Sequence, residues 1–109
     1  MGVQEEAYWE ISCNGEPVSH YVRVRVGELA FVLKLLGGEV KKDIVPEVVI
    51  ITNGMKTFFF PDPLPEEGEA TWKFRYEPVT PDKARVKMLV IISHPNTKLM
   101  IFELTAIYG

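Results

Sequence analysis

Residues 48–60 read VVIITNGMKTFFF and contain the strongest fold signal in the chain. Asn53-Gly54 stands between two runs rich in β-branched and aromatic residues, and an Asn-Gly pair tolerates the positive φ angles of a tight hairpin turn. A two-residue loop sets Val49 opposite Phe58. The run before the turn is apolar on both faces, which is typical of an interior strand. The sequence therefore predicts a β-hairpin in the middle of the fold.

A second Asn-Gly pair, Asn14-Gly15, predicts a hairpin near the start of the chain. Its turn sets Cys13 opposite Glu16, and the same count continued outward sets Tyr8 opposite Tyr21. Alternation then defines one face that we expect to be buried in the core. Its members are Trp9, Ile11, Val18, His20, Val22, Val24 and Val26.

The second half of the chain supplies three more strand-like runs. Residues 61–69 are acidic and rich in proline, which predicts a surface loop where the chain changes sheet or direction. Residues 71–76 alternate, which places Trp72, Phe74 and Tyr76 inward and Thr71, Lys73 and Arg75 outward. Residues 84–92 and 98–108 form the final hairpin, in which we expect Ile91 opposite Leu99, Met88 opposite Phe102 and Lys87 opposite Glu103.

Residues 28–36 fit two structures. A helix is supported by the apolar spacing of Leu29, Val32, Leu33 and Leu36. A tight hairpin across residues 37 and 38 fits badly because it sets lysine against lysine. We favour a strand because the surrounding segments are all β-like, although periodicity alone does not separate the two structures in so short a run.

The chain of 109 residues has the size of one domain, and we expect residues 1–109 to form it. About seven or eight strand-like runs, the Asn-Gly turns and the proline-rich crossover predict an all-β fold. The predicted architecture is an antiparallel β-sandwich of immunoglobulin-like or related topology. The alternative is an α+β domain with one short helix near residues 28–36.

Composition disfavours several functional classes. Twelve Lys and Arg residues stand against 15 Asp and Glu residues, so the net charge is −3 and there is no overall positive field to attract nucleic acid. The apolar runs are too short to span a membrane. The single cysteine favours a reducing, cytoplasmic setting. One glutamine and three asparagines are few, which favours a thermophilic source.

Reactive side chains are few and scattered. We expect Cys13 to be buried and inert, and His94 to lie in an exposed turn. The acidic group of Asp62, Glu66, Glu67 and Glu69 does not have the order of a calcium loop. No phosphate-binding glycine pattern and no nucleophile-base pair is present. The sequence therefore predicts no enzyme activity, no cofactor and no metal site.

Basic and aromatic residues that alternate outward suggest one ligand-binding surface. Its members are Tyr21, Arg23, Arg25, Lys73 and Arg75. If their strands are neighbours, this basic face resembles the grooves that bind single-stranded nucleic acid. A platform for carbohydrate is likewise suggested by the aromatic residues Trp9, Trp72 and Tyr76. Alternation along their strands directs these side chains inward, however, which favours a place in the core. A sandwich that binds either ligand is the alternative function.

The final hairpin has more apolar surface than one core needs. One face provides core residues, and the other carries Leu89, Ile91, Leu99 and Ile101. These four residues need cover from residues 28–36, from another chain or from a partner. We therefore expect a non-enzymatic protein-interaction or assembly module that self-associates through this hairpin, with a protein partner or a homo-oligomer as its complex.

Overall fold

Both Asn-Gly pairs turn the chain as predicted. The φ angles are 53° and 82° at Asn14 and Gly15, and 51° and 77° at Asn53 and Gly54. The first turn joins β1 (Tyr8–Cys13) to β2 (Glu16–Pro17), and the second joins β5 (Glu47–Thr52) to β6 (Met55–Phe59). Cys13 lies opposite Glu16 and Val49 opposite Phe58, so both registers are confirmed at the turn.

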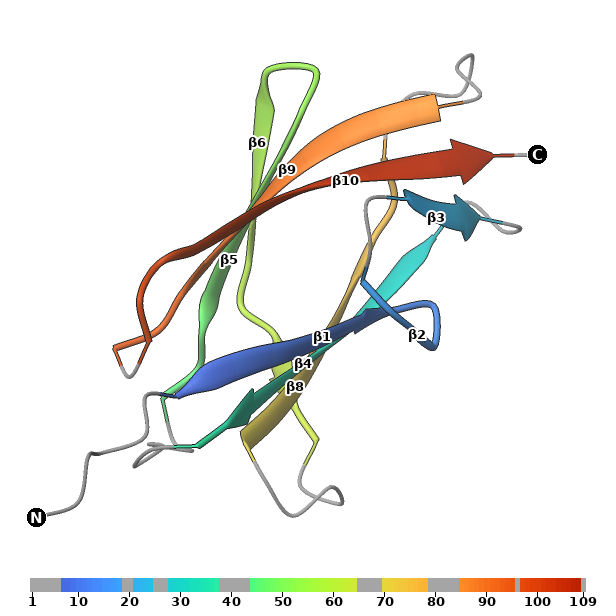
Figure 1. Ribbon diagram of the computed structural model, residues 1–109. Helices are drawn as coiled ribbons and strands as arrows, with labels where there is room; N and C mark the ends of the chain where they lie inside the picture. The colour runs from blue at the N-terminus through green and yellow to red at the C-terminus, as the bar shows by residue number, and fades with distance from the viewer. Residues whose placement is uncertain are drawn as a thin grey trace, which may run out of the picture.

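The computed structural model describes residues 7–18, 21–24, 28–37, 44–64, 70–78, 85–95 and 97–108. Two sheets pack face to face as an all-β sandwich (Figure 1). The first sheet has the order β2-β1-β4-β8-β7, and the second has the order β3-β10-β9-β5-β6. The other strands are β3 (Tyr21–Val24), β4 (Leu29–Leu36), β7 (Asp62–Pro63), β8 (Ala70–Tyr76), β9 (Arg85–Ser93) and β10 (Met100–Tyr108).

Strand β4 resolves the ambiguity of residues 28–36 in favour of a strand. Leu29, Phe31, Leu33 and Leu35 are buried, and the residues between them are half-buried, which is the alternation of a strand and not of a helix. It lies between β1 and β8 inside the first sheet. It therefore leaves the outer side of the final hairpin uncovered, contrary to one of the predicted options.

The first hairpin is shorter than predicted. The last bond between its two arms is donated by the Val18 N–H to the Ile11 carbonyl. Beyond this bond the chain crosses to the second sheet. There β3 pairs in parallel with β10 and Tyr21 lies opposite Thr105, so the predicted Tyr8–Tyr21 pair is wrong. His20, which was predicted to share the buried face with Trp9, lies outside the described residues.

The final hairpin forms with a register shifted by two residues. Ile101 lies opposite Ile91 and Leu104 opposite Met88, so the predicted pairs of this hairpin are wrong. The loop is longer than expected because His94 turns inward and is buried. A shift of two residues leaves every side chain on its predicted face. Lys87 and Glu103 still approach to 3.6 Å as a diagonal ion pair.

Aromatic side chains and one polar contact join the two sheets. Phe74 of β8 stacks on Phe31 with ring centroids 4.8 Å apart and lies 4.9 Å from Phe59 of the second sheet. The Tyr76 hydroxyl lies 2.7 Å from the Thr52 hydroxyl, also across the layers. Trp72 and Tyr76 are buried as predicted. Thr71 was predicted to face outward, but it is buried too.

The proline-rich crossover moves the chain between the sheets as predicted. Strand β6 is the edge of the second sheet, and β7, which follows Pro61, is the edge of the first. Strand β7 has two residues, and the Leu64 N–H adds one bond to the Thr71 carbonyl; its proline lies on an edge strand, where a missing N–H is tolerated. Residues 65–69, which contain most of the predicted acidic loop, lie outside the described residues.

Candidate functional site

One apolar row crosses four neighbouring strands on the solvent side of the second sheet. Ile101 lies opposite Ile91, Ile91 opposite Val49, and Val49 opposite Phe58. The two ends of the row are more than half exposed, at 55% for Ile101 and 57% for Phe58. Strands lie about 4.8 Å apart, so the row is roughly 14 Å long.

A parallel row beside it is apolar in the middle and charged at both ends. Glu103 lies opposite Leu89, Leu89 opposite Ile51, and Ile51 opposite Lys56. The acid and the base stand on β10 and β6, on opposite sides of the two apolar residues. We call the two rows together the outer apolar face; its members are Ile101, Ile91, Val49, Phe58, Leu89 and Ile51, with Glu103 and Lys56 as its rim.

The structure brings the predicted interface residues together. Leu89, Ile91 and Ile101 belong to the outer apolar face. Leu99 is 59% exposed and shares a shallow depression with Glu47 and Ser93 at one end of this surface. Within the described ranges, no segment of the chain packs over the outer apolar face.

Sequence reasoning missed half of this surface. Val49, Ile51 and Phe58 come from the β5–β6 hairpin, which was predicted as an interior element. The signal was present, because the run before Asn53 is apolar on both faces. What the sequence lacked was the information that β5 pairs with β9, which makes one surface of two hairpins.

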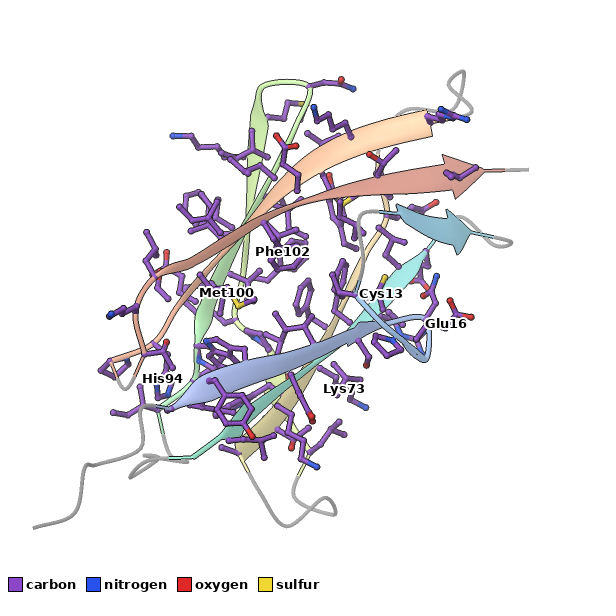
Figure 2. The ribbon with its side chains drawn as sticks, in the orientation of Figure 1. Cys13, Glu16, Lys73, His94, Met100 and Phe102 are labelled. Atoms are coloured by element: carbon purple, nitrogen blue, oxygen red, sulfur yellow. The ribbon has the colours of Figure 1, made fainter. Side chains whose placement is uncertain are left out.

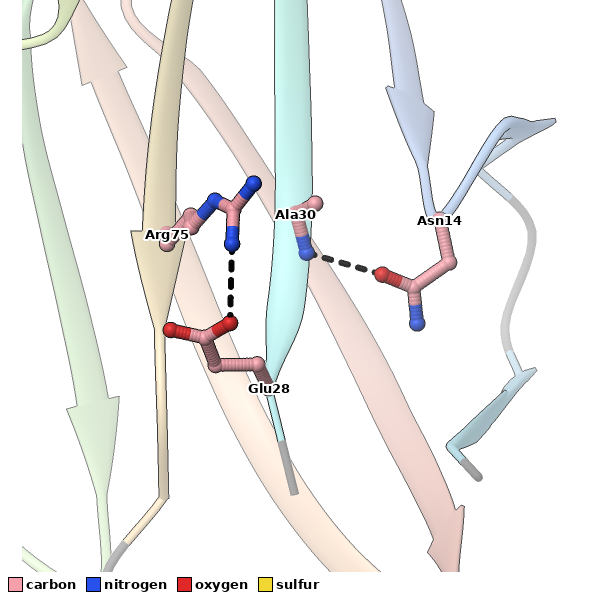
Figure 3. Close-up of polar contacts among 4 residues, drawn as sticks. All are labelled: Asn14, Glu28, Ala30 and Arg75. Atoms are coloured by element: carbon pink, nitrogen blue, oxygen red, sulfur yellow. Dashed lines mark hydrogen bonds and ion pairs between the residues drawn. The ribbon is translucent and has the colours of Figure 1, made fainter. Parts of the chain in front are cut away.

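The outer side of the first sheet differs in character. One row there joins Ser12, Val32, Lys73 and Asp62 across four strands. Figure 3 shows Arg75 of β8 beside Glu28, whose carboxylate accepts a hydrogen bond from the guanidinium at 3.1 Å. In the same view the Asn14 carboxamide oxygen accepts a bond from the Ala30 N–H at 2.8 Å. This outer side therefore carries charged residues in its row, whereas the row Ile101–Ile91–Val49–Phe58 of the second sheet carries none.

The predicted basic face is not one surface. Tyr21 and Arg23 belong to β3 in the second sheet, whereas Lys73 and Arg75 belong to β8 in the first. The strands are not neighbours, which was the condition for a groove that binds single-stranded nucleic acid. Arg25 lies outside the described residues. The carbohydrate platform also lacks its surface, because Trp72 and Tyr76 are 1% and 8% exposed.

His94 lies in the interior and not in an exposed turn as predicted. It is 6% exposed, and its Nε2–H donates to the Ile44 carbonyl, 3.0 Å away. Its ring meets the edge of Trp9 at a centroid distance of 6.0 Å and also contacts Trp72. These contacts describe a structural side chain that pins the β9–β10 loop to the first sheet.

Cys13 is buried as predicted, at the end of β1. Its side chain is 1% exposed, and burial raises the pKa of the thiol from 9.0 to about 12. A thiol that stays protonated at neutral pH is a poor nucleophile. Among the described residues, no three acidic, histidine or cysteine side chains gather as a metal site would require.

An apolar cleft opens at the side of the sandwich between β1 and β10. Its volume is about 580 Å³. Figure 2 shows Met100 and Phe102 directed from β10 into the space between the sheets. The lining residues are Trp9, Ile11, Val18, Met100, Ile101, Phe102 and Glu103. This cleft extends inward from the edge of β10, whereas the outer apolar face covers the outer side of the same sheet; the two share Ile101 and Glu103.

Comparison with protein-family models and with curated proteins identifies no relative of this chain. No protein-family model matches the chain, and no curated protein matches it. The regular elements of the described ranges are all strands, so they contain no helix that is long and apolar enough to cross a membrane. The outer apolar face and the cleft are thus the two features of this part of the chain that bear on function.

Proposed function

We propose that this protein is a non-enzymatic assembly module that self-associates through the outer apolar face. The main support for this is the uncharged row Ile101–Ile91–Val49–Phe58, which crosses four hydrogen-bonded strands. A contiguous apolar patch on a soluble domain marks an interaction surface more often than it marks ordinary surface. The outer side of the first sheet is the internal comparison, since its row Ser12–Val32–Lys73–Asp62 contains two charged residues.

The order of charges across the face favours a second copy as the partner. A two-fold axis that runs along the strands between β9 and β5 places β10 of one copy over β6 of the other. Ile101 then faces Phe58 of the second copy. Glu103 faces Lys56 of the second copy, and symmetry repeats this ion pair at the opposite rim. In this arrangement the apolar residues of the face meet apolar residues, and its rim charges meet opposite charges.

We also infer an immunoglobulin-like topology. The strands can be lettered in chain order as A (β1), B (β4), C (β5), C′ (β6), D (β7), E (β8), F (β9) and G (β10). The two sheets then contain ABED and GFCC′, which is the strand arrangement of immunoglobulin-like sandwiches. In this lettering the outer apolar face covers the GFCC′ sheet.

A reducing, cytoplasmic setting and a thermophilic source complete the proposal. The buried free thiol of Cys13 is compatible with a reducing compartment. The low content of Asn and Gln favours a thermophilic source. A melting temperature in the mesophilic range of about 45–65 °C contradicts that source.

The first test is the solution mass by light scattering across a tenfold range of protein concentration. We expect a dimer for the wild type and a folded monomer for Ile101→Lys and for Leu89→Lys. Val32→Lys is the matched control, because it adds the same charge to a half-buried apolar position on the outer side of the first sheet. It should remain dimeric. A wild type that is monomeric at every concentration overturns the proposal.

A charge exchange tests the two-fold arrangement. Lys56→Glu alone and Glu103→Lys alone each set like charges together at both rims, so we expect weaker association. The double variant restores opposite charges and should recover dimerisation. Lys73→Glu, on the other sheet, is the control for the loss of a lysine. Because Glu103 also pairs with Lys87 of the same chain at 3.6 Å, all these variants carry Lys87→Ala; a double variant no better than the single variants then excludes this axis.

A further inference from the structure

The cleft between β1 and β10 is bounded at both ends. At one end the Trp9 indole N–H donates to the Thr97 hydroxyl at 3.3 Å, and the Trp9 ring packs edge-on with His94. At the other end Val18 lines the cleft next to its bond with Ile11. Trp9, Ile11 and Val18 also pack against the main core. The floor is therefore built from the apolar interior of the sandwich.

Both strands beside the cleft have a free edge there. Strand β10 pairs with β9 along residues 100–107, but β3 joins its other side only from Thr105 onward. Within the described part of the chain, residues 100–104 of β10 thus have a partner strand on one side only. Strand β1 pairs with β4 along its length; on its other side it meets β2 at Ser12 and Cys13, and the Ile11 carbonyl accepts one further bond from the Val18 N–H.

We propose that this cleft binds an extended peptide segment with apolar residues at alternate positions, which pairs with the free edge of β10. The added strand would occupy the line that β3 already follows beside residues 105–108. Free backbone N–H and C=O groups provide the affinity in this mode of recognition, and pockets for alternate side chains provide the specificity.

The lining matches the period of such a strand. Met100 and Phe102 are two residues apart on β10, and Trp9 and Ile11 are two residues apart on β1. Every second side chain of a bound strand would enter the space between these pairs. In the described part of the chain the unpaired edge of residues 100–104 is roughly 16 Å long, so it accommodates about five residues of peptide. Peptide binding here goes beyond self-association through the outer apolar face, and the two surfaces share Ile101 and Glu103 of β10.

The test uses the acetylated and amidated peptide KVTVTVK, titrated into the ¹⁵N-labelled full chain and followed by amide NMR shifts. We expect saturable shifts in residues 100–104 and 8–11. The peptide KVTPTVK carries proline at the centre, loses the central N–H and should bind about tenfold more weakly or not at all.

A matched pair of variants locates the site. Met100→Lys places a charge in the cleft and should weaken binding by about tenfold, a difference of about 1.4 kcal/mol. Met55→Lys makes the same substitution on β6, where Met55 is 64% exposed, and should bind like the wild type. Absence of shifts at about 2 mM peptide, shifts centred on residues 55–59, or equal binding of the proline peptide overturns the proposal. A chain that proves monomeric leaves this test unchanged.

Discussion

Cys13 illustrates how one buried side chain links folding to pH. The thiol is neutral in the native state up to a pKa of about 12, against 9.0 when exposed. Above pH 9 the unfolded chain therefore releases a proton that the native chain retains. The native state then binds more protons than the unfolded state, so stability falls as pH rises through this window.

The comparison with Cys13→Ala isolates this effect. Between pH 9 and pH 12 the wild type should lose up to about 1.4 kcal/mol of unfolding free energy per pH unit relative to the variant. Urea unfolding at a series of pH values measures the difference, and all other titrating groups are common to both chains. Parallel stability curves for the two proteins would show that the thiol is solvated in the native state.

His94 stabilises the loop between β9 and β10 through its bond to the Ile44 carbonyl. His94→Phe keeps an aromatic ring between Trp9 and Trp72 but removes the donor, which should cost about 1–3 kcal/mol of unfolding free energy. His94→Gln retains an N–H at a similar reach and should recover part of the loss. Urea denaturation of the three chains measures both effects. An unchanged stability in His94→Phe contradicts this role.

At the scale of elements, the turn sequences predicted strand pairing more accurately than the strand sequences did. Asn14-Gly15 and Asn53-Gly54 determined the pairing next to each turn, because few residues accept positive φ angles. The predicted pairing was wrong farther from the turns. The first hairpin ended at Pro17, and the final hairpin, which has no such tight turn, shifted its register by two residues.

The β5–β6 turn provides the prediction at this scale. Gly54 has a φ of 77° and nothing within 4 Å of an added Cβ, so Gly54→Ala tests backbone strain without a steric clash. The substitution should cost about 1–2 kcal/mol. Asn53→Gly, at a φ of 51°, should change stability by only a few tenths of a kcal/mol. Thermal unfolding measures both variants, and a Gly54→Ala variant as stable as the wild type excludes the strained turn.

At the scale of the whole molecule, the sandwich has two unlike outer sides. The first sheet carries charge on its rows, and the second carries an apolar row with an acid and a base at the rim of the row beside it. The inner faces of both sheets pack against each other in the core. Within the described ranges, no segment of the chain packs against the outer apolar face. Because of this difference, we propose that self-association uses the second sheet and not the first.

The dimer should respond weakly to salt. Its buried area is mainly apolar, and each exposed rim pair contributes only about 0–1 kcal/mol. The two symmetry-related pairs together contribute at most about 2 kcal/mol, so raising NaCl from about 0.1 M to about 1 M should change the dissociation constant by less than about thirtyfold. Analytical ultracentrifugation at the two salt concentrations measures the constant. Dissociation of the dimer at high salt would indicate an interface held by charges.

The sequence by itself determined the all-β class, both Asn-Gly turns, a change of sheet or direction after Pro61, and the inner and outer faces of β8, β9 and β10 with one exception. Turn chemistry and a period of two are local properties, so a single chain displays them directly. The exception was Thr71, which alternation placed outside and the structure buries.

Only the tertiary structure decided which strands are neighbours. It separated Arg23 from Lys73 into different sheets, placed β3 beside β10 and joined Val49 to Ile91 as one surface. It also turned His94 into the interior. Pairing between distant strands depends on packing of the whole chain and not on any local pattern, so the extent of the outer apolar face and the existence of the cleft emerged only from the assembled sandwich.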